Sequence, residues 1–493
     1  MLFNSIEFIF LFLPVAAIVY WLLLKAELPK LAKVWLVASS LFFYGWWKAA
    51  YLILLIISIL INFACGSAII ASRSKKQKKS LMILGITFNL VLLGYFKYSH
   101  FLVENFNKFS TSEFGPLDVI LPLAISFFTF QQIAYLSDCR SDHDSKYNLL
   151  DYFLFVSFFP QLIAGPIVHH KEMIPQFDIS NSNSMFPNNI EKGLFIFAIG
   201  LFKKVVIADT FAIWATAGFS FTTQLSFLDA WLTSLSYTFQ LYYDFSGYTD
   251  MAIGAALLFN IKLPMNFNSP YKAKNIQDFW HRWHMTLSRW LRDYVYIPLG
   301  GNRSGSCNTF VNLFVTFLLG GIWHGAGWTF IIWGALHGFA VLVHRVWRNI
   351  GMEMNNICGW IITFMFVNFS WVFFRAETIN EAIMVASGML GLNGFELSEN
   401  FHSIFVYILD ITANKLPSIQ EQFVSSPVTV LFVLIFGAIA LFCKNSMEIS
   451  GFNSDTVQKL TFAKGFATII LAFAALFVSM GDSVPSEFLY FNF

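Results

Sequence analysis

The amino-acid sequence predicts an all-α integral membrane protein whose helices, some of them re-entrant or broken, surround a central cavity. Of its 493 residues, 57% are hydrophobic and only 12% are charged, whereas soluble domains carry roughly 25% charged residues. Apolar segments of spanning length recur along the chain, and hydropathy alone gives about eleven transmembrane helices, plus or minus two. No internal repeat or low-complexity tract is visible, so we expect residues 1–493 to form one polytopic domain.

The apolar segments follow one another closely, and several are short or joined without a real loop, which predicts re-entrant pieces. In order, they lie near residues 7–24, 34–47, 49–71, 80–96, 117–136, 150–168, 193–218, 228–258, 309–343, 356–374, 427–443 and 463–480. The first has neither a basic start nor an obvious cleavage site, so we expect a retained span rather than a removed signal peptide.

Basic residues between the first spans predict the orientation of the chain. The loop from Arg73 to Lys79 carries five positive charges and no acids, so we expect it to be cytoplasmic. Counting back through the spans places the loop from Lys25 to Lys33 on the cytoplasmic side too. Its three lysines against one glutamate agree with that side. The N-terminus is then expected outside.

His324 is the first candidate for a functional residue, because it lies within the apolar run 309–343. An ionisable side chain inside a bilayer costs roughly 2.5 kcal/mol or more unless the fold supplies a cavity or a partner. The run exceeds the ~20 residues that one span requires, so we expect a break or bend near the surrounding glycines. These are Gly320, Gly321, Gly325 and Gly327. The plainer interpretation is a packing histidine bonded to a neighbouring carbonyl.

The stretch 262–307 is a long polar interruption that we expect to be a cytoplasmic, amphipathic or re-entrant segment. Its acidic residues are Asp278 and Asp293. Its basic residues are more numerous: Lys262, Lys272, Lys274, Arg282, Arg289, Arg292 and Arg303. Residues 275–295 have apolar side chains at helical spacing with arginines opposite, which predicts an amphipathic helix. His284 lies at the border of the apolar arc. An interfacial helix with no site is the alternative.

Three clusters of polar residues interrupt other apolar segments, at 126–132, 159–166 and 242–250. Each could serve only to hold neighbouring helices together through hydrogen bonds. Their number nevertheless predicts a wet internal cavity. The side chains that we expect to line it are Gln131, Tyr243, Asp244, Ser246 and Trp323.

Several classes of site lack support in the sequence. The five cysteines are scattered without a paired spacing, so neither a disulfide framework nor a zinc site is indicated. The histidine pairs 169/170 and 281/284 lack a nearby completing ligand, and no HExxH, GxxxxGK[ST] or GxGxxG motif occurs, so we predict no metal and no nucleotide hydrolysis. The basic residues form no soluble domain that would bind nucleic acid.

Eight motifs taken together resemble one family. They are WHG (323–325), RWH (282–284), LSRWLRDYVYIPLGGNR (287–303), DFSGYTDMAIG (244–254), LPLAISFFTFQ (121–131), FPQLIAGPI (159–167), WVFFRA (371–376) and FLYFNF (488–493). With these motifs in the family's order along the chain, the sequence resembles a membrane-bound O-acyltransferase (MBOAT), and specifically the alginate O-acetylase branch. The likeness extends from the first span to the last residue, with a poor match between about 378 and 425.

The resemblance implies an enzyme of the bacterial cytoplasmic (inner) membrane that takes acetyl groups from cytoplasmic acetyl-CoA and delivers them across the bilayer. The recipient would be an extracytoplasmic partner protein or the polysaccharide itself, with an alginate-like exopolysaccharide favoured. Acetylation of peptidoglycan or cellulose, or D-alanylation of teichoic acid, stays open. The resemblance also implies that His324 and His284 are the catalytic histidines. No tightly bound cofactor is expected.

Acyl transfer from a thioester needs a nucleophile, a base and stabilisation of an oxyanion. In the favoured hypothesis, His324 deprotonates the acceptor hydroxyl, which attacks acetyl-CoA directly, while His284 polarises the thioester carbonyl or orients the donor. In the other, His324 itself carries the acetyl group. Coenzyme A carries several phosphate charges, which predicts donor binding by Arg282, Arg289, Arg292 and Arg303. Anionic lipid headgroups are the rival ligands of these arginines.

A carrier without chemistry, such as a flippase of a lipid-linked saccharide, is the alternative from another class. Broken helices and buried carboxylates would suit it equally well. Transfer of acetyl from acetyl-CoA by the purified protein would distinguish the two.

Overall fold

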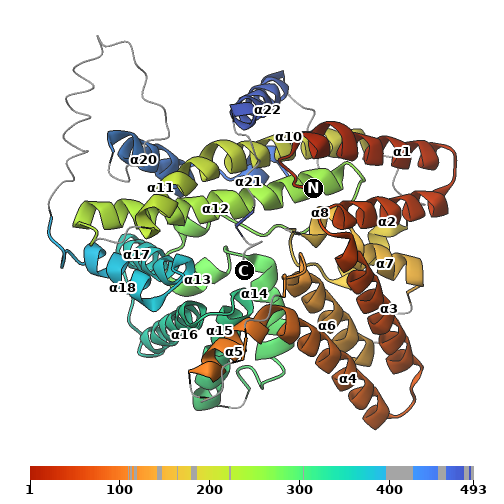
Figure 1. Ribbon diagram of the computed structural model, residues 1–493, viewed down its shortest axis with the longest axis horizontal. Coiled ribbons are helices and arrows are strands. Elements are labelled where there is room, and N and C mark those ends of the chain that lie inside the picture. The colour runs from red at the N-terminus through yellow and green to blue at the C-terminus, as the bar shows by residue number, and fades with distance from the viewer. Residues whose placement is uncertain are drawn as a thin grey trace.

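The computed structural model describes residues 1–108, 119–141, 147–163, 165–178, 186–220, 224–303, 305–395, 426–452 and 462–481, with 110, 114–115 and 488–489. Within these ranges every regular element is a helix (Figure 1). The expected all-α class is therefore confirmed. Of the C-terminal FLYFNF motif, only Phe488 and Leu489 lie inside the described residues.

The first half of the chain forms helices joined by short connections. In order they are η1 (Phe8–Phe12), α1 (Leu13–Lys25), α2 (Pro29–Gly45), α3 (Ala49–Ala71), α4 (Lys75–Leu93), η2 (Gly94–Tyr98), α5 (Ser99–Asn107), α6 (Ile125–Ser141), α7 (Leu149–Ser157), α8 (Phe159–Leu162), α9 (His170–Met173), η3 (Ile174–Phe177), α10 (Phe186–Phe202), η5 (Lys203–Ala208) and α11 (Asp209–Phe219). The elements η1, η2 and η5 are π-helical turns that continue directly into α-helices.

The second half contains the longest helix and the broken segments. Its elements are α12 (Phe227–Leu257), η6 (Pro270–Lys272), α13 (Ile276–Trp280), α14 (Met285–Leu291), η7 (Arg292–Tyr296), α15 (Ser306–His324), α16 (Trp328–Asn349), α17 (Asn356–Arg375), α18 (Ile379–Met389), α20 (Pro427–Phe442), α21 (Ser446–Ser450) and α22 (Phe462–Gly481). Figure 1 shows α10 and α11, which follow each other through η5, lying along α12, with α13 to α17 below α12 in this view.

Six of the described helical stretches are long and apolar enough to cross a membrane. They are Phe8–Lys25, Ala49–Ala71, Lys75–Asn107, Ser306–His324, Trp328–Asn349 and Asn356–Arg375. The protein is therefore a multi-pass membrane protein. The count of about eleven spans, the orientation and the single-domain organisation stay predictions.

Glycines in α10 and α12 bring these two helices into close contact. A Cβ atom added to Gly200 would lie 2.6 Å from the carbonyl oxygen of Gly247, and one added to Gly193 would lie 2.7 Å from that of Gly254. Membrane helices pack in this way because small residues let the two backbones approach. The close approach fixes α12, the helix that carries the 242–250 polar cluster.

The apolar run 309–343 breaks where the glycines predicted. Helix α15 ends at His324, Gly325 and Gly327 are extended, and α16 begins at Trp328. A Cβ atom on Gly321 would lie 2.9 Å from the Cα atom of Gly334, so the two helices form a tight hairpin. His324 therefore lies at the end of a helix inside the protein.

The amphipathic pattern of 275–295 predicts which side chains are buried, but the single helix it suggested is wrong. The chain is interrupted after Trp280, and the next α-helix begins at Met285. His284 precedes it with φ 41° and ψ 53°, a left-handed conformation that a side chain with Cβ seldom adopts. Hydrogen bonds from Met285 and Thr286 to Asn266 hold this turn. Met285 N donates to the backbone oxygen of Asn266 at 3.0 Å, and Thr286 N donates to its side chain.

Candidate active site

His324 lies in an aromatic environment at the C-terminal end of α15. Its side chain is 2% exposed, and its ring centroid is 4.9 Å from Trp323, 5.0 Å from Trp333 and 5.1 Å from Phe374. The centroid of the His284 ring is 6.5 Å away. The structure thus brings together the two histidines that were predicted to be catalytic, from two separate elements.

His284 is completely buried and is held by Asn266. The Oδ1 atom of Asn266 lies 3.1 Å from His284 Nδ1, and it also accepts from the backbone N–H of Thr286 at 3.3 Å and from the Thr286 hydroxyl at 2.9 Å. The ring of Phe245 contacts His284 edge-on at 4.8 Å. The interruption in the predicted helix therefore serves to place this imidazole.

The partners of Asn266 determine which nitrogen of His284 carries the proton. A backbone N–H can only donate, so the atom facing Thr286 N is an acceptor, the amide oxygen. His284 Nδ1 must then donate to it. In the neutral ring Nε2 then carries a lone pair and no proton. Nε2 has no hydrogen-bond partner among the described residues. His284 therefore presents an acceptor, rather than a donor, to its surroundings.

His337 shows what a packing histidine looks like in this protein. Trp280 Nε1 donates to its Nδ1 at 3.3 Å, and its Nε2 lies 3.0 Å from the hydroxyl of Ser370. Both ring nitrogens are thus engaged, so this ring holds α13, α16 and α17 together. Within the described ranges, no three His, Cys, Asp or Glu side chains lie close enough to hold a metal ion.

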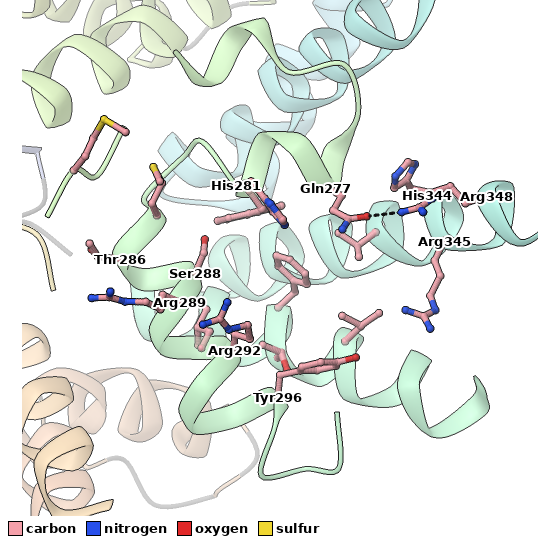
Figure 2. Close-up of a pocket in the computed structure, with 18 of the residues that line it drawn as sticks. Gln277, His281, Thr286, Ser288, Arg289, Arg292, Tyr296, His344, Arg345 and Arg348 are labelled. Atoms are coloured by element: carbon pink, nitrogen blue, oxygen red, sulfur yellow. Dashed lines mark hydrogen bonds between the residues drawn. The ribbon is translucent and has the colours of Figure 1, made fainter. Parts of the chain in front are cut away.

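A cavity of about 880 Å³ opens beside the segment that carries His284 (Figure 2). Its walls come from α13, α14, η7, α15 and α16. Met285 and Thr286, the two residues that follow His284, line it, whereas the imidazoles of His284 and His324 do not. Trp280, Leu291 and Phe317 supply apolar wall. The cavity therefore reaches the residues next to His284.

The charged residues that line this cavity are all basic. Arg289 and Arg292 project from one side, and Arg345 and Arg348 from the other, as Figure 2 shows. Arg289 donates to both carboxylate oxygens of Glu172, at 2.7 and 3.0 Å, and Arg292 pairs with the adjacent Asp293. Among the described residues, no carboxylate pairs with the two arginines of α16. The cavity is consequently suited to an anion.

The arginines of α16 were missed in the sequence. Arg345 is half-buried, and Arg348 Nη1 donates to Gln277 Oε1 at 3.4 Å. The signal was the run His344, Arg345 and Arg348 at the end of an apolar helix, since the spacing of three or four residues places side chains on one helix face.

Two of the four arginines predicted to bind a donor lie elsewhere. Arg282 Nε donates to Asp278 at 2.7 Å, and its Nη1 donates to the backbone oxygen of Asn268 at 3.3 Å. Arg303 is exposed. Neither lines the cavity. Arg289 and Arg292 are the two that the structure brings together around it.

The side chains predicted to line a cavity divide into two groups. Trp323 contacts the His324 ring, and Gln131 is buried on α6 beside Phe130, which stacks on Trp323 at 4.9 Å. The residues of α12 bind other helices instead. Tyr243 donates to Phe436 O, Asp244 pairs with Lys204 and accepts from Leu489 N, and Ser246 accepts from Lys203.

Comparisons with known proteins agree with the family suggested by the motifs. Residues 118–381 match the model of the membrane-bound O-acyltransferase family. The chain is 48% identical to the peptidoglycan O-acetyltransferase of Helicobacter pylori, over all of this chain and 98% of that protein. It is 37% identical to the probable alginate O-acetylase AlgI of Pseudomonas putida, over the whole of both chains.

A more distant relative is the teichoic acid D-alanyltransferase of Bacillus subtilis, 29% identical over 53% of this chain and 70% of that protein. The matched region includes the buried histidine pair and the basic cavity. The chain belongs to the membrane-bound O-acyltransferase family and is an acyltransferase.

Proposed function

We propose that this protein takes acetyl groups from cytoplasmic acetyl-CoA and delivers them across the inner membrane for O-acetylation of an extracytoplasmic polysaccharide. One observation carries the proposal: a basic cavity extends to the residues next to His284, and His284 faces His324 inside the membrane domain. The acceptor would receive the acetyl group directly or through a periplasmic partner protein.

The cavity supports coenzyme A as the carrier of the acetyl group. Its volume of about 880 Å³ falls within the range of pockets that bind large organic ligands. Guanidinium groups bind phosphate oxygens in a planar, bidentate way, and Arg345 and Arg348 line this cavity without a carboxylate partner in the described part of the chain. With the phosphates held there, the pantetheine arm would run along the apolar wall toward Thr286.

The chemistry follows from the two imidazoles. The oxygen of the acceptor hydroxyl attacks the thioester carbonyl carbon while His324 takes its proton. The carbon–sulfur bond then breaks, and the imidazolium returns the proton to the thiolate of coenzyme A. Because His284 presents the lone pair of Nε2, it orients the acceptor by accepting a hydrogen bond from a second hydroxyl of the sugar, since the attacking hydroxyl gives its single proton to His324. A neutral ring in this form cannot donate to the carbonyl oxygen through Nε2.

The acceptor polymer is proposed from the relatives. A full-length relative at 48% identity is a peptidoglycan O-acetyltransferase, whereas the alginate O-acetylase stands at 37%. Peptidoglycan is therefore the better-supported acceptor, and an alginate-like exopolysaccharide is the second.

The test begins with a strain that lacks the gene. Acetate released by mild alkali from purified peptidoglycan and from exopolysaccharide would be compared with that of the parent strain. We expect loss of ester-linked acetate from peptidoglycan and its return when the gene is restored. In parallel, proteoliposomes supplied with radiolabelled acetyl-CoA and the acceptor should form labelled ester. If both polymers keep their ester-linked acetate and no label is transferred, the proposal of acetyl transfer from acetyl-CoA to these polymers is wrong.

A further inference from the structure

Lys97 lies at the end of the helix that carries His324. This lysine belongs to η2, far from α15 in the sequence. Its Nζ donates to the carbonyl oxygen of Trp323 at 2.6 Å and to that of His324 at 3.1 Å. A third contact, at 3.3 Å, goes to the hydroxyl of Ser126, close to the start of α6.

The neighbouring tyrosine completes the arrangement. The hydroxyl of Tyr98 donates to the carbonyl oxygen of Ile322 at 2.6 Å. Two consecutive side chains of η2 therefore bind the last three carbonyl groups of α15. The last four carbonyls of an α-helix have no partner within the helix, and carbonyls at a buried helix end need partners from the protein. These two side chains supply the hydrogen-bond donors that the break after His324 removes from the end of α15.

The amino group of Lys97 suits its position. Its N–H groups donate to carbonyl oxygens at the negative end of the helix dipole. The lysine has no carboxylate partner within 4.0 Å among the described residues, so main-chain oxygens and one hydroxyl are its ligands. Its Nζ also lies 5.7 Å from the ring centroid of Trp323. The amino group thus contacts both the backbone and the ring of the residue before His324.

We propose that Lys97 is the positioning residue of the active site: it binds the end of α15 and thereby fixes the backbone from which the His324 imidazole projects. Nothing in the motifs around the two histidines assigns a role to this residue. The inference rests on the proposed acyl transfer for its kinetic consequence, but its structural consequence can be measured without any activity.

The kinetic experiment compares Lys97→Met with the wild-type protein in proteoliposomes. Methionine keeps most of the length of the side chain and removes its amino group. Because misplacement of a catalytic group by about 1 Å can cost up to a hundredfold, we expect kcat to fall on the order of tenfold or more. The KM for acetyl-CoA should stay within about twofold, since the donor cavity is untouched. Lys108→Met, an exposed lysine nearby, should match the wild type.

A rescue experiment separates positioning from general folding. Lys97→Ala leaves space for a small amine, and ethylamine should restore part of kcat, whereas ethanol should not. A merely structural lysine would lower yield and melting temperature without any response to amines. Activity of Lys97→Met above half of the wild-type value would overturn the proposal, provided that the wild type transfers acetyl.

Hydrogen exchange tests the same inference if no transfer is found at all. Peptides that cover residues 318–327 should exchange faster in Lys97→Met than in the wild type, because the end of α15 loses a ligand. Peptides from α12 should be unchanged. Equal exchange at 318–327 would show that Lys97 does not hold this helix end, whatever the reaction is.

Discussion

Asn266 accepts a hydrogen bond from His284, with Oδ1 3.1 Å from Nδ1, and the same oxygen accepts from the backbone and hydroxyl of Thr286. One amide oxygen therefore holds both the turn that places the imidazole and the position of its proton.

Replacing Asn266 tests that relationship. Asn266→Ala should lower kcat on the order of tenfold and destabilise the protein by about 1–3 kcal/mol, since it leaves buried donors unsatisfied. Asn266→Asp keeps the acceptor oxygens and should retain much more activity. Initial rates and thermal unfolding in detergent provide the measurements. Asn302→Ala, an exposed position, is the control. Equal rates for the Ala and Asp variants would contradict the assigned role.

The two histidines proposed to be catalytic should differ in the effect of their loss. His324→Ala should abolish acetyl transfer because it removes the proposed general base, and His284→Gln should keep measurable residual activity. His100→Ala, an exposed histidine on α5, should behave as the wild type. Direct attack by the acceptor also predicts that acetyl-CoA alone leaves His324 unmodified in peptide mass spectra. A stoichiometric acetyl group on His324 would replace direct attack by a relay.

The basic cavity should distinguish donors by their phosphates. Arg345→Ala is expected to raise the KM for acetyl-CoA about tenfold, the value of one charge-assisted hydrogen bond. With S-acetylpantetheine, which lacks the nucleotide, the same variant should differ from the wild type by less than about twofold. Arg303→Ala, which lies outside the cavity, is the matched control. A variant with unchanged KM for both donors would mean that coenzyme A binds elsewhere.

The glycines of the α15–α16 hairpin should respond differently to the same change. Alanine at Gly321 would press on the backbone of Gly334, so we expect a loss of about 1–3 kcal/mol. Alanine at Gly320 meets only a leucine methyl at 3.3 Å and should have little effect. Melting temperatures in one detergent would compare the two variants. If Gly320→Ala were as unstable as Gly321→Ala, the requirement for glycine would come from the break in the helix and not from the close approach of α15 and α16.

The buried ion pair between Lys203 and Asp250, 2.7 Å apart, gives a prediction about charge balance. Lys203→Met alone should cost about 3–5 kcal/mol, because it leaves a buried carboxylate without its partner. The double change Lys203→Met with Asp250→Leu should be more stable than the single one. Lys108→Met, which removes an exposed pair with Glu104, should change stability by less than about 1 kcal/mol. Thermal unfolding of the three variants and the wild type measures this order.

Much of this architecture was available from the sequence. The excess of apolar residues predicted the all-α membrane class, and the glycines around His324 predicted the break that ends α15. The motifs predicted the family. These predictions succeeded because hydropathy and backbone freedom are local properties that one sequence records directly.

The rest depended on contacts between distant segments. Residues 275–295 have an unbroken helical pattern, yet the chain turns at His284 because Asn266, outside that window, binds the next two residues. Arg345 joins Arg289 at one cavity only after α16 folds against α13 and α15. Tyr243, Asp244 and Ser246 stood out as polar residues in a span, but periodicity could not reveal that their partners lie on α20, η5 and the C-terminal segment.

The π-helical turns make this fold sensitive to insertions and deletions. A π-turn holds one residue more than an α-turn, and η2 and η5 each use neighbouring side chains together. Lys97 and Tyr98 both reach α15, and Lys203 and Lys204 both reach α12. Deleting one residue would close such a turn into regular helix and rotate everything before it by about 100°. When relatives are aligned, a one-residue gap at these turns thus marks a changed set of partners.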